Sequence, residues 1–105
     1  MAKLIVVRWR DIPAQVIVKN GRKSAKVQLS ERFQVAIDRA AMRAGKGSSD
    51  AYLEDWRRQP PRDCGSDLRA EAVAEAQRIE GSYSDEALEC LVRAKGLAAD
   101  GAPNY

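Results

Sequence analysis

The side chains with the clearest chemical potential are basic and lie in the first quarter of the chain. Together with one tryptophan they form a candidate anion- or partner-binding set: Arg8, Trp9, Arg10, Lys19, Arg22, Lys23 and Lys26. Guanidinium and ammonium groups beside an exposed aromatic ring can hold a phosphate, a polyanion or single-stranded nucleic acid. The structural alternative is that lysines on an edge strand block aggregation, while Trp9 lies in the core with Ile5 and Val7.

Charge is divided unevenly along the 105-residue chain. Residues 1–46 hold eleven Lys and Arg against three acids, a balance of +8, and residues 47–105 hold seven against twelve, a balance of −5. Such a split predicts one of two arrangements. Either the two halves neutralise each other in the fold, or the N-terminal half presents a basic binding face.

A second candidate set is apolar. Tyr52, Leu53 and Trp56 are spaced to lie together on a short helix next to Pro60-Pro61, and exposed apolar side chains of this kind indicate a surface for a protein partner. The same three side chains could instead cover the main core.

The sequence offers little for catalysis. It contains no histidine, which is the commonest general base at neutral pH. The stretch Gly45–Ser49 resembles the end of a phosphate-binding loop, but Ala40 stands where the first glycine of that motif belongs. Acidic residues at helical spacing, such as Glu71 with Glu75, are typical of a solvated helix face. We therefore predict no catalytic residues, no metal site and no cofactor.

The two cysteines, Cys64 and Cys90, belong to no CxxC pair. Zinc sites need clustered Cys and His side chains, so packing or surface roles in a reducing compartment are expected. A third hypothesis is a minor catalytic role that borrows residues from a partner. In that case Cys64, in a loop with Pro, Gly and Arg62, is the expected nucleophile.

Period-two patterns predict strands over Lys3–Arg10 and Ala14–Lys19, separated by a break that contains Pro13. The dipeptide Asn20-Gly21 then predicts a type I′ hairpin that leads into a third strand.

The register that this turn implies can be checked against the sequence. It pairs Val16 with Ala25 and gives the hairpin one apolar and one basic face, which a slip of one residue would scramble. The competing possibility is a helix that starts as early as Lys23.

Helical spacing of apolar residues predicts four helices. Their expected bounds are Glu31–Ala44 (capped by Ser30 and stopped by Gly45), Asp50–Arg58, Asp67–Glu80 (ended by Gly81), and a segment capped by Ser84 that stops at Gly96-Leu97. The stretch Gln59–Ser66 is expected to be a loop, and the short link between the last two helices predicts an αα-hairpin.

These elements indicate an α+β fold in which an N-terminal three-stranded antiparallel meander packs against about four helices. One domain is expected over residues 1–97, followed by a flexible tail over 98–105. The first eight residues hold only four consecutive large apolar side chains, which is too few for a signal peptide or a membrane span. A cytoplasmic location without membrane association is therefore expected.

Three stretches carry a family resemblance: Trp9–Val18 (WRDIPAQVIV), Leu29–Phe33 (LSERF) and Ile37–Arg43 (IDRAAMR). They resemble a bacterial family described as virulence factor. That name denotes a phenotype, so the resemblance transfers no catalytic residues. Small stand-alone members look like those encoded near genes of one-carbon metabolism. This implies an accessory subunit for a methylenetetrahydrofolate reductase or a corrinoid methyltransferase in folate-linked methyl transfer.

Two functional hypotheses lead. The first is a non-enzymatic accessory or interaction subunit with a protein partner. The alternative is a small protein that binds an anion or nucleic acid through the basic β-hairpin, with an affinity that falls as salt rises.

Overall fold

The computed structural model describes residues 2–46 and 48–97, and these form an α+β fold as predicted. The antiparallel sheet consists of β1 (Ala2–Trp9), β2 (Ile12–Asn20), β3 (Lys23–Gln28), β4 (Trp56–Arg58) and β5 (Arg62–Cys64). The helices are α1 (Glu31–Arg43), α2 (Ser49–Glu54), α3 (Leu68–Ser82) and α4 (Asp85–Arg93). The predicted tail over 98–105 lies outside the described residues.

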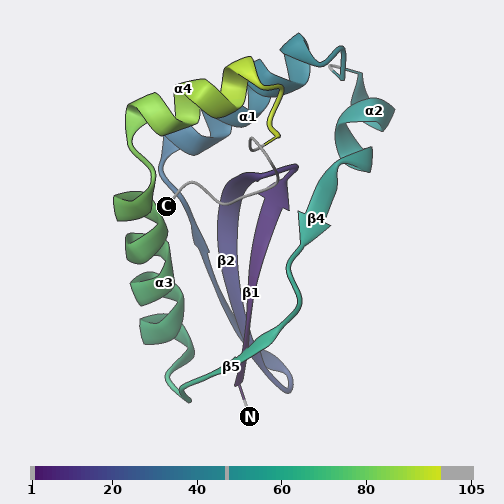
Figure 1. Cartoon of the computed structure of the whole chain (residues 1–105). Coiled ribbons are helices and arrows are strands. Elements are labelled where there is room, and N and C mark those ends of the chain that lie inside the picture. The colour runs from purple at the N-terminus through teal and green to yellow at the C-terminus, as the bar shows by residue number, and fades with distance from the viewer. Residues whose placement is uncertain (1, 47, 98–105) are drawn as a thin grey trace.

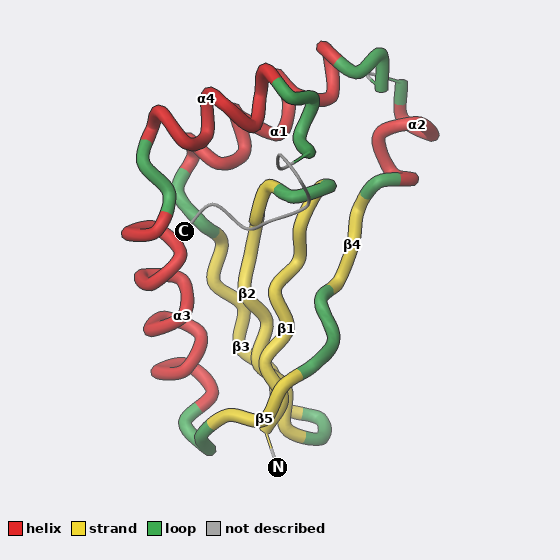
Figure 2. The backbone as a smooth tube through the Cα atoms, viewed as in Figure 1, coloured by secondary structure: helices red, strands yellow, loops and turns green. Residues whose placement is uncertain are grey.

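Strand β1 has hydrogen-bonded neighbours on both of its edges. The strand order is β3-β2-β1-β4, and β5 also pairs with β1. Strand β4 pairs with Val7–Trp9 and β5 with Ala2–Leu4, so the two short strands share one edge of β1. Figure 1 shows α1 and α4 side by side across one end of the sheet. Helix α3 runs along the sheet and packs against β2 and β3, as the tube in Figure 2 also shows.

The predicted break between the first two strands is a tight turn followed at once by β2. The chain reverses at Arg10 and Asp11, and Arg10 takes a φ of 51°. Pro13 belongs to β2, which corrects the prediction. Its place there is a β-bulge: Val7 lies opposite Gln15 and Arg8 opposite Pro13, so that Ala14 is one extra residue in β2. Bulges are among the few places in a sheet that accept proline, because it has no N–H to donate.

The hairpin between β2 and β3 exists, but its turn is displaced by one residue from the prediction. Asn20 pairs with Lys23, so the two loop residues are Gly21 and Arg22. Of the four turn residues only Gly21 has a positive φ, 62°, which is the requirement of a type II′ turn rather than type I′. Val16 consequently faces Val27 instead of Ala25. Because the pairing moves by two positions in all, the apolar face is preserved.

Strands β4 and β5 correct two further predictions. The expected helix over 50–58 ends at Glu54, and Trp56–Arg58 is a strand. The expected loop over 59–66 contains the strand Arg62–Cys64. Each has three residues, which is too short to show a period of two. They form because the second edge of β1 has backbone N–H and C=O groups that need partners.

One hydrophobic cluster joins the sheet to α1, α3 and α4. Its helical members recur at helical spacing: Phe33, Ala36, Ile37 and Ala40 from α1, Ala72, Ala76 and Ile79 from α3, and Leu88, Leu91 and Val92 from α4. Leu68 and Val73, which lie near this stripe of α3, are only half-buried. Ile5, Val7 and Ile17 are buried outside this cluster, on the opposite side of their strands from Leu4 and Val6.

The helix ends follow the predictions with small shifts. Helix α1 stops before Gly45, whose φ is 72°, whereas α3 continues past Gly81 to Ser82. At the end of α4 the N–H groups of Lys95 and Gly96 donate to Val92 and Leu91, at 3.1 and 2.7 Å. This is the predicted Schellman motif. Its first left-handed residue is Lys95, however, and Gly96 follows with a φ of 86°.

In the described part of the chain, no helix combines the length and the apolar content needed to cross a bilayer.

Candidate functional site

The basic set divides into two groups, and the first of them is engaged by the fold. Arg8 donates through Nη1 to the carbonyl oxygen of Asp11 at 3.4 Å and to the hydroxyl of Tyr83 at 3.2 Å. Arg10 forms an ion pair with Asp55 at 3.4 Å and donates to the carbonyl oxygen of Lys95 at 2.8 Å. These two arginines therefore fasten the β1–β2 turn to its surroundings.

Trp9 is a core residue. Its side chain is 0% exposed, and its indole N–H donates to the carbonyl oxygen of Tyr52 at 2.8 Å. The Tyr52 ring stacks on it with a centroid distance of 6.0 Å. The ring thus cannot stack on a nucleic-acid base. Trp9 is a core residue, as the alternative expected, but it belongs to the cluster of Leu4 and Val6 and not with Ile5 and Val7.

The second group remains at the surface. Lys19, Arg22, Lys23 and Lys26 are exposed on the β2–β3 hairpin, and the described chain offers them no ion pair. We call these four residues the hairpin cations. Other cations do pair with the acidic half, as in Arg10–Asp55 and Arg39–Glu89. The acidic half thus neutralises part of the N-terminal positive charge, and another part is exposed on the hairpin.

The predicted apolar set does not form one surface. Tyr52 and Trp56 are half-buried, meet edge to face at a centroid distance of 5.7 Å, and pack against the core. Only Leu53 projects outward, with 63% of its surface exposed. Trp56 moreover lies on β4 and not on the helix. The core-covering alternative applies to two of the three residues.

Cys64 is poorly suited to act as a nucleophile. It is a free, half-buried thiol on β5. Burial, together with the nearby carboxylate of Glu71, raises the pKa of the Cys64 thiol. A raised pKa keeps the group protonated at neutral pH, whereas the thiolate is the reactive form. Among the described residues, no cluster of His, Cys, Asp and Glu side chains could hold a metal ion.

One concave surface was not anticipated from the sequence. It is a pocket of about 510 Å³ between α1 and α4, lined by Glu31, Arg32, Val35, Ala36, Arg39, Asp85, Leu88, Glu89 and Val92. An adjoining hollow of about 470 Å³ continues it toward Met42, Arg43 and Val92. We call the two together the α1–α4 groove.

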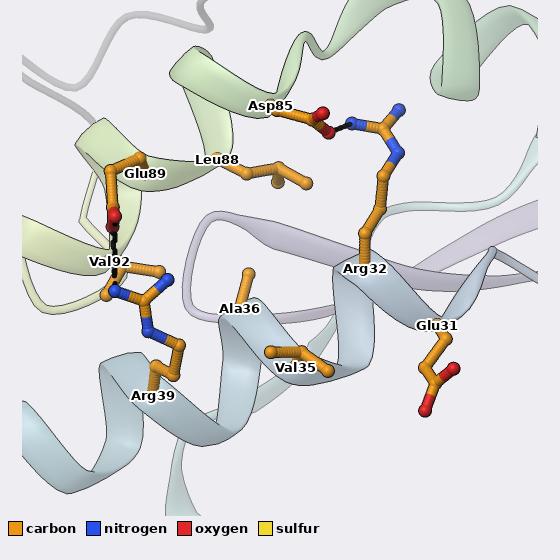
Figure 3. A pocket seen from close by; sticks show the side chains of 9 residues that line it. All are labelled: Glu31, Arg32, Val35, Ala36, Arg39, Asp85, Leu88, Glu89 and Val92. Atoms are coloured by element: carbon orange, nitrogen blue, oxygen red, sulfur yellow. Dashed lines mark hydrogen bonds and ion pairs between the residues drawn. The ribbon is translucent and has the colours of Figure 1, made fainter.

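Two ion pairs cross the groove. Arg32 meets Asp85 at 3.2 Å, and Arg39 meets Glu89 at 3.0 Å. Figure 3 shows Leu88 of α4 and Ala36 of α1 between these pairs. Surface ion pairs contribute only about 0–1 kcal/mol each, so their effect here is to set the position of the two helices rather than to stabilise the fold.

The start of α4 is placed by the end of α3. Glu80 of α3 accepts hydrogen bonds from the Ser30 N–H and hydroxyl, at 2.6 and 3.0 Å. Arg32 bridges Glu80 and Asp85, and the Ser84 side chain caps α4 by accepting from the Ala87 N–H. Ser30 is thus held by a carboxylate instead of capping α1 with its own side chain.

The apolar part of the groove is open to solvent. Val35 is 46% exposed and Met42 is 73% exposed. They lie seven residues apart and therefore on the same side of α1, on a face separate from the buried stripe. That spacing is the signal through which the sequence could have revealed this surface.

The two ends of the groove carry opposite charges. Because Arg32 meets Asp85 and the later residue Arg39 meets the later residue Glu89, α1 and α4 run in the same direction. Glu31 therefore marks one end of the groove, and Arg43 marks the other.

Fold and groove together define a small α+β protein with an open groove between two parallel helices. The sequence profile of the virulence factor family matches residues 7–92, so the chain belongs to that family. No curated protein and no solved structure matches it.

Proposed function

We propose that this protein is a non-enzymatic interaction subunit that receives an amphipathic helix of a partner protein in the α1–α4 groove. One observation carries the proposal. The groove has an apolar floor of Ala36, Leu88 and Val92, and beside it Val35 and Met42 expose apolar surface that the described chain leaves uncovered. An amphipathic helix lays such an apolar stripe into a groove through residues at i, i+4 and i+7.

Charge favours one direction for that helix. The groove is acidic at Glu31 and basic at Arg43, and both of its helices run from the acidic to the basic end. A helix commonly carries acids in its first turn and bases in its last. Such a helix matches the groove when it lies antiparallel to α1 and α4, because its basic end then meets Glu31 and its acidic end meets Arg43.

The family resemblance suggests which proteins to test as partners. The resemblance implies an accessory role in folate-linked methyl transfer, so a methylenetetrahydrofolate reductase and a corrinoid methyltransferase of the source organism are the first choices. The proposal of a helix-binding groove does not depend on either enzyme being the partner.

The double variant Val35→Asp, Met42→Asp is expected to weaken partner binding at least tenfold. Each substitution removes apolar surface worth about 1.5–3 kcal/mol when fully buried, and it places a charge where the partner would remove water. Binding of the purified full-length chain to each purified candidate enzyme, measured by calorimetry, tests this.

The control is Leu53→Asp, which places on an exposed apolar residue outside the groove the single charge that Val35→Asp or Met42→Asp adds alone. It should bind as the unchanged chain does. If Leu53→Asp loses as much affinity as the double variant, or if a partner binds both variants normally, the groove is not the binding surface.

A second candidate function rests on the hairpin cations. Four positive side chains without an ion pair in the described structure stand together on one hairpin, whereas Arg8 and Arg10 on the neighbouring strand are engaged. This supports binding of a polyanion such as nucleic acid through backbone phosphates. The competing explanation is that Lys23 and Lys26 protect the edge strand β3 from pairing with other chains.

The variant Lys23→Glu, Lys26→Glu separates these explanations. If the hairpin binds nucleic acid, the unchanged chain should bind a single-stranded oligonucleotide at low salt, with an affinity that falls steeply as salt rises. The charge reversal should abolish that binding. Fluorescence anisotropy measures it, and absence of binding by the unchanged chain at low salt would eliminate this function.

A further inference from the structure

A polar pocket opens among β1, β5 and α3, and it shares no lining residue with the α1–α4 groove. Its volume is about 660 Å³, within the usual range for small-molecule sites. Its lining residues are Arg8, Gln59, Pro60, Arg62, Glu75 and Arg78. The lining therefore contains three guanidinium groups and one carboxylate, and its formal charge is +2.

Glu75 holds two of these arginines in place. It is the only charged or polar side chain of the described core, 7% exposed. Its Oε1 accepts from Arg62 at 2.8 Å and from Arg78 Nε at 3.0 Å, while its Oε2 accepts from Arg78 Nη2 at 2.5 Å. The hydrogen bonds from Arg78 hold the pKa of Glu75 below its ordinary value. The carboxylate is consequently ionised at neutral pH and accepts hydrogen bonds from both guanidinium groups.

Arg8 and Arg62 have donors left over. Arg62 uses a single nitrogen, Nη2, for its bond to Glu75, and its side chain is 58% exposed. Arg8 uses only Nη1, for both of its hydrogen bonds. The other N–H groups of these two side chains have no hydrogen-bond partner within the described chain. A guanidinium group with two free N–H donors can bind two oxygens of one phosphate group at once.

We infer that this pocket binds the phosphate group of a small-molecule ligand, with Arg8 and Arg62 as donors and Glu75 as the residue that positions Arg62. A doubly charged phosphate group matches the pocket's charge of +2. The rest of the ligand would lie against Gln59 and Pro60, which complete the lining. None of the hairpin cations belongs to this site, so it is independent of the nucleic-acid alternative.

Titration of the ¹⁵N-labelled full-length chain with inorganic phosphate, and separately with ribose 5-phosphate, tests the inference by nuclear magnetic resonance at constant ionic strength. Saturable shifts of the Arg8 and Arg62 side-chain N–H signals are expected with both probes. Arg62→Gln should weaken binding about fivefold or more, because it removes one unit charge at contact distance from the anion.

Two further variants make the result decisive. Arg69→Gln removes the same charge from an exposed position of α3 outside the pocket, and it should bind phosphate as the unchanged chain does. Glu75→Gln keeps an amide oxygen that can accept from Arg62, so Arg62 stays positioned while the pocket charge rises to +3. Binding should therefore tighten, an effect that a purely structural role would not produce. The inference is overturned if no saturable shift appears at millimolar phosphate, or if Arg62→Gln and Arg69→Gln lose affinity equally. A folded Glu75→Gln chain that binds more weakly would overturn it as well; if that variant does not fold, the Arg62 and Arg69 pair decides.

Discussion

Replacing Trp9 with alanine is expected to lower the free energy of unfolding by about 3–5 kcal/mol, the usual cost of truncating a buried tryptophan. The side chain is 0% exposed, stacks on Tyr52 and donates its indole N–H to the Tyr52 carbonyl oxygen. The substitution therefore leaves a cavity and also a carbonyl oxygen without its donor. Urea denaturation followed by circular dichroism measures the loss. A small domain has about 5–15 kcal/mol of stability in total, so the variant should unfold at a far lower urea concentration.

Trp56→Ala is the comparison for this measurement. Trp56 is only half-buried and lies on a three-residue strand at the edge of β1, so its truncation removes less buried surface. Equal losses for the two variants would contradict the central position of Trp9 in the core.

Gly96→Ala is expected to lower the free energy of unfolding by about 2–5 kcal/mol. Gly96 has a φ of 86°, where a residue with a Cβ is strained by about 1–2 kcal/mol. In addition, a Cβ at this position would lie 2.9 Å from Cζ3 of Trp9. The indole ring has no free space to retreat into, because it is fully buried, and overpacking of this kind typically costs a further 1–3 kcal/mol. Urea denaturation again provides the measurement.

Gly45→Ala isolates the two contributions. Gly45 has a similar φ of 72°, but a Cβ there would meet no atom within 4 Å. Only the backbone strain should appear, about 1 kcal/mol. The clash with the indole ring should also vanish in the double variant Trp9→Ala, Gly96→Ala, so the two losses should add up to more than the double variant shows. Strict additivity, or equal losses for the two glycines, would refute the contact.

The sequence predicted which side chains are buried better than it predicted which strands pair and in which register. The inward residues of α1, α3 and α4 recur at helical spacing, and a helix with such a stripe has one way to bury it. The hairpin between β2 and β3 was likewise predicted, although the turn lies at Gly21-Arg22 instead of Asn20-Gly21. Both neighbouring turns preserve the apolar face, so the pattern alone could not choose between them.

Long-range pairing was the part that local patterns could not supply. Strands β4 and β5 form because β1 has a second edge that needs partners. A pattern of three residues cannot indicate a partner that lies between 47 and 62 positions away. The same limit applies to the candidate sites. The exposure of the hairpin cations could be predicted from their own strand pattern. The α1–α4 groove and the pocket around Glu75 depend on where α4 and β5 are placed, which no single segment determines.

Several basic residues of the N-terminal half form ion pairs with acids of the C-terminal half. Arg32 and Arg39 meet acids of α3 and α4 across the groove, so much of the N-terminal positive charge serves to assemble the molecule. Of the N-terminal basic residues, the hairpin cations and Arg43 are exposed and have no ion pair among the described residues. A basic composition in the first half of such a chain therefore overstates its capacity to bind nucleic acid.

The bond between Arg10 and the carbonyl oxygen of Lys95 joins positions 85 residues apart, and the Asp11 N–H donates to Gly96 beside it. These two long-range hydrogen bonds affect the order in which the parts of the fold assemble. Closing a loop of that length costs about 4 kcal/mol in chain entropy, and contacts so distant slow folding relative to local ones. While the chain is being synthesised, the first hairpin emerges long before the segment that covers its tryptophan. We therefore expect the mature architecture to form only after translation has passed Gly96, in a single late step.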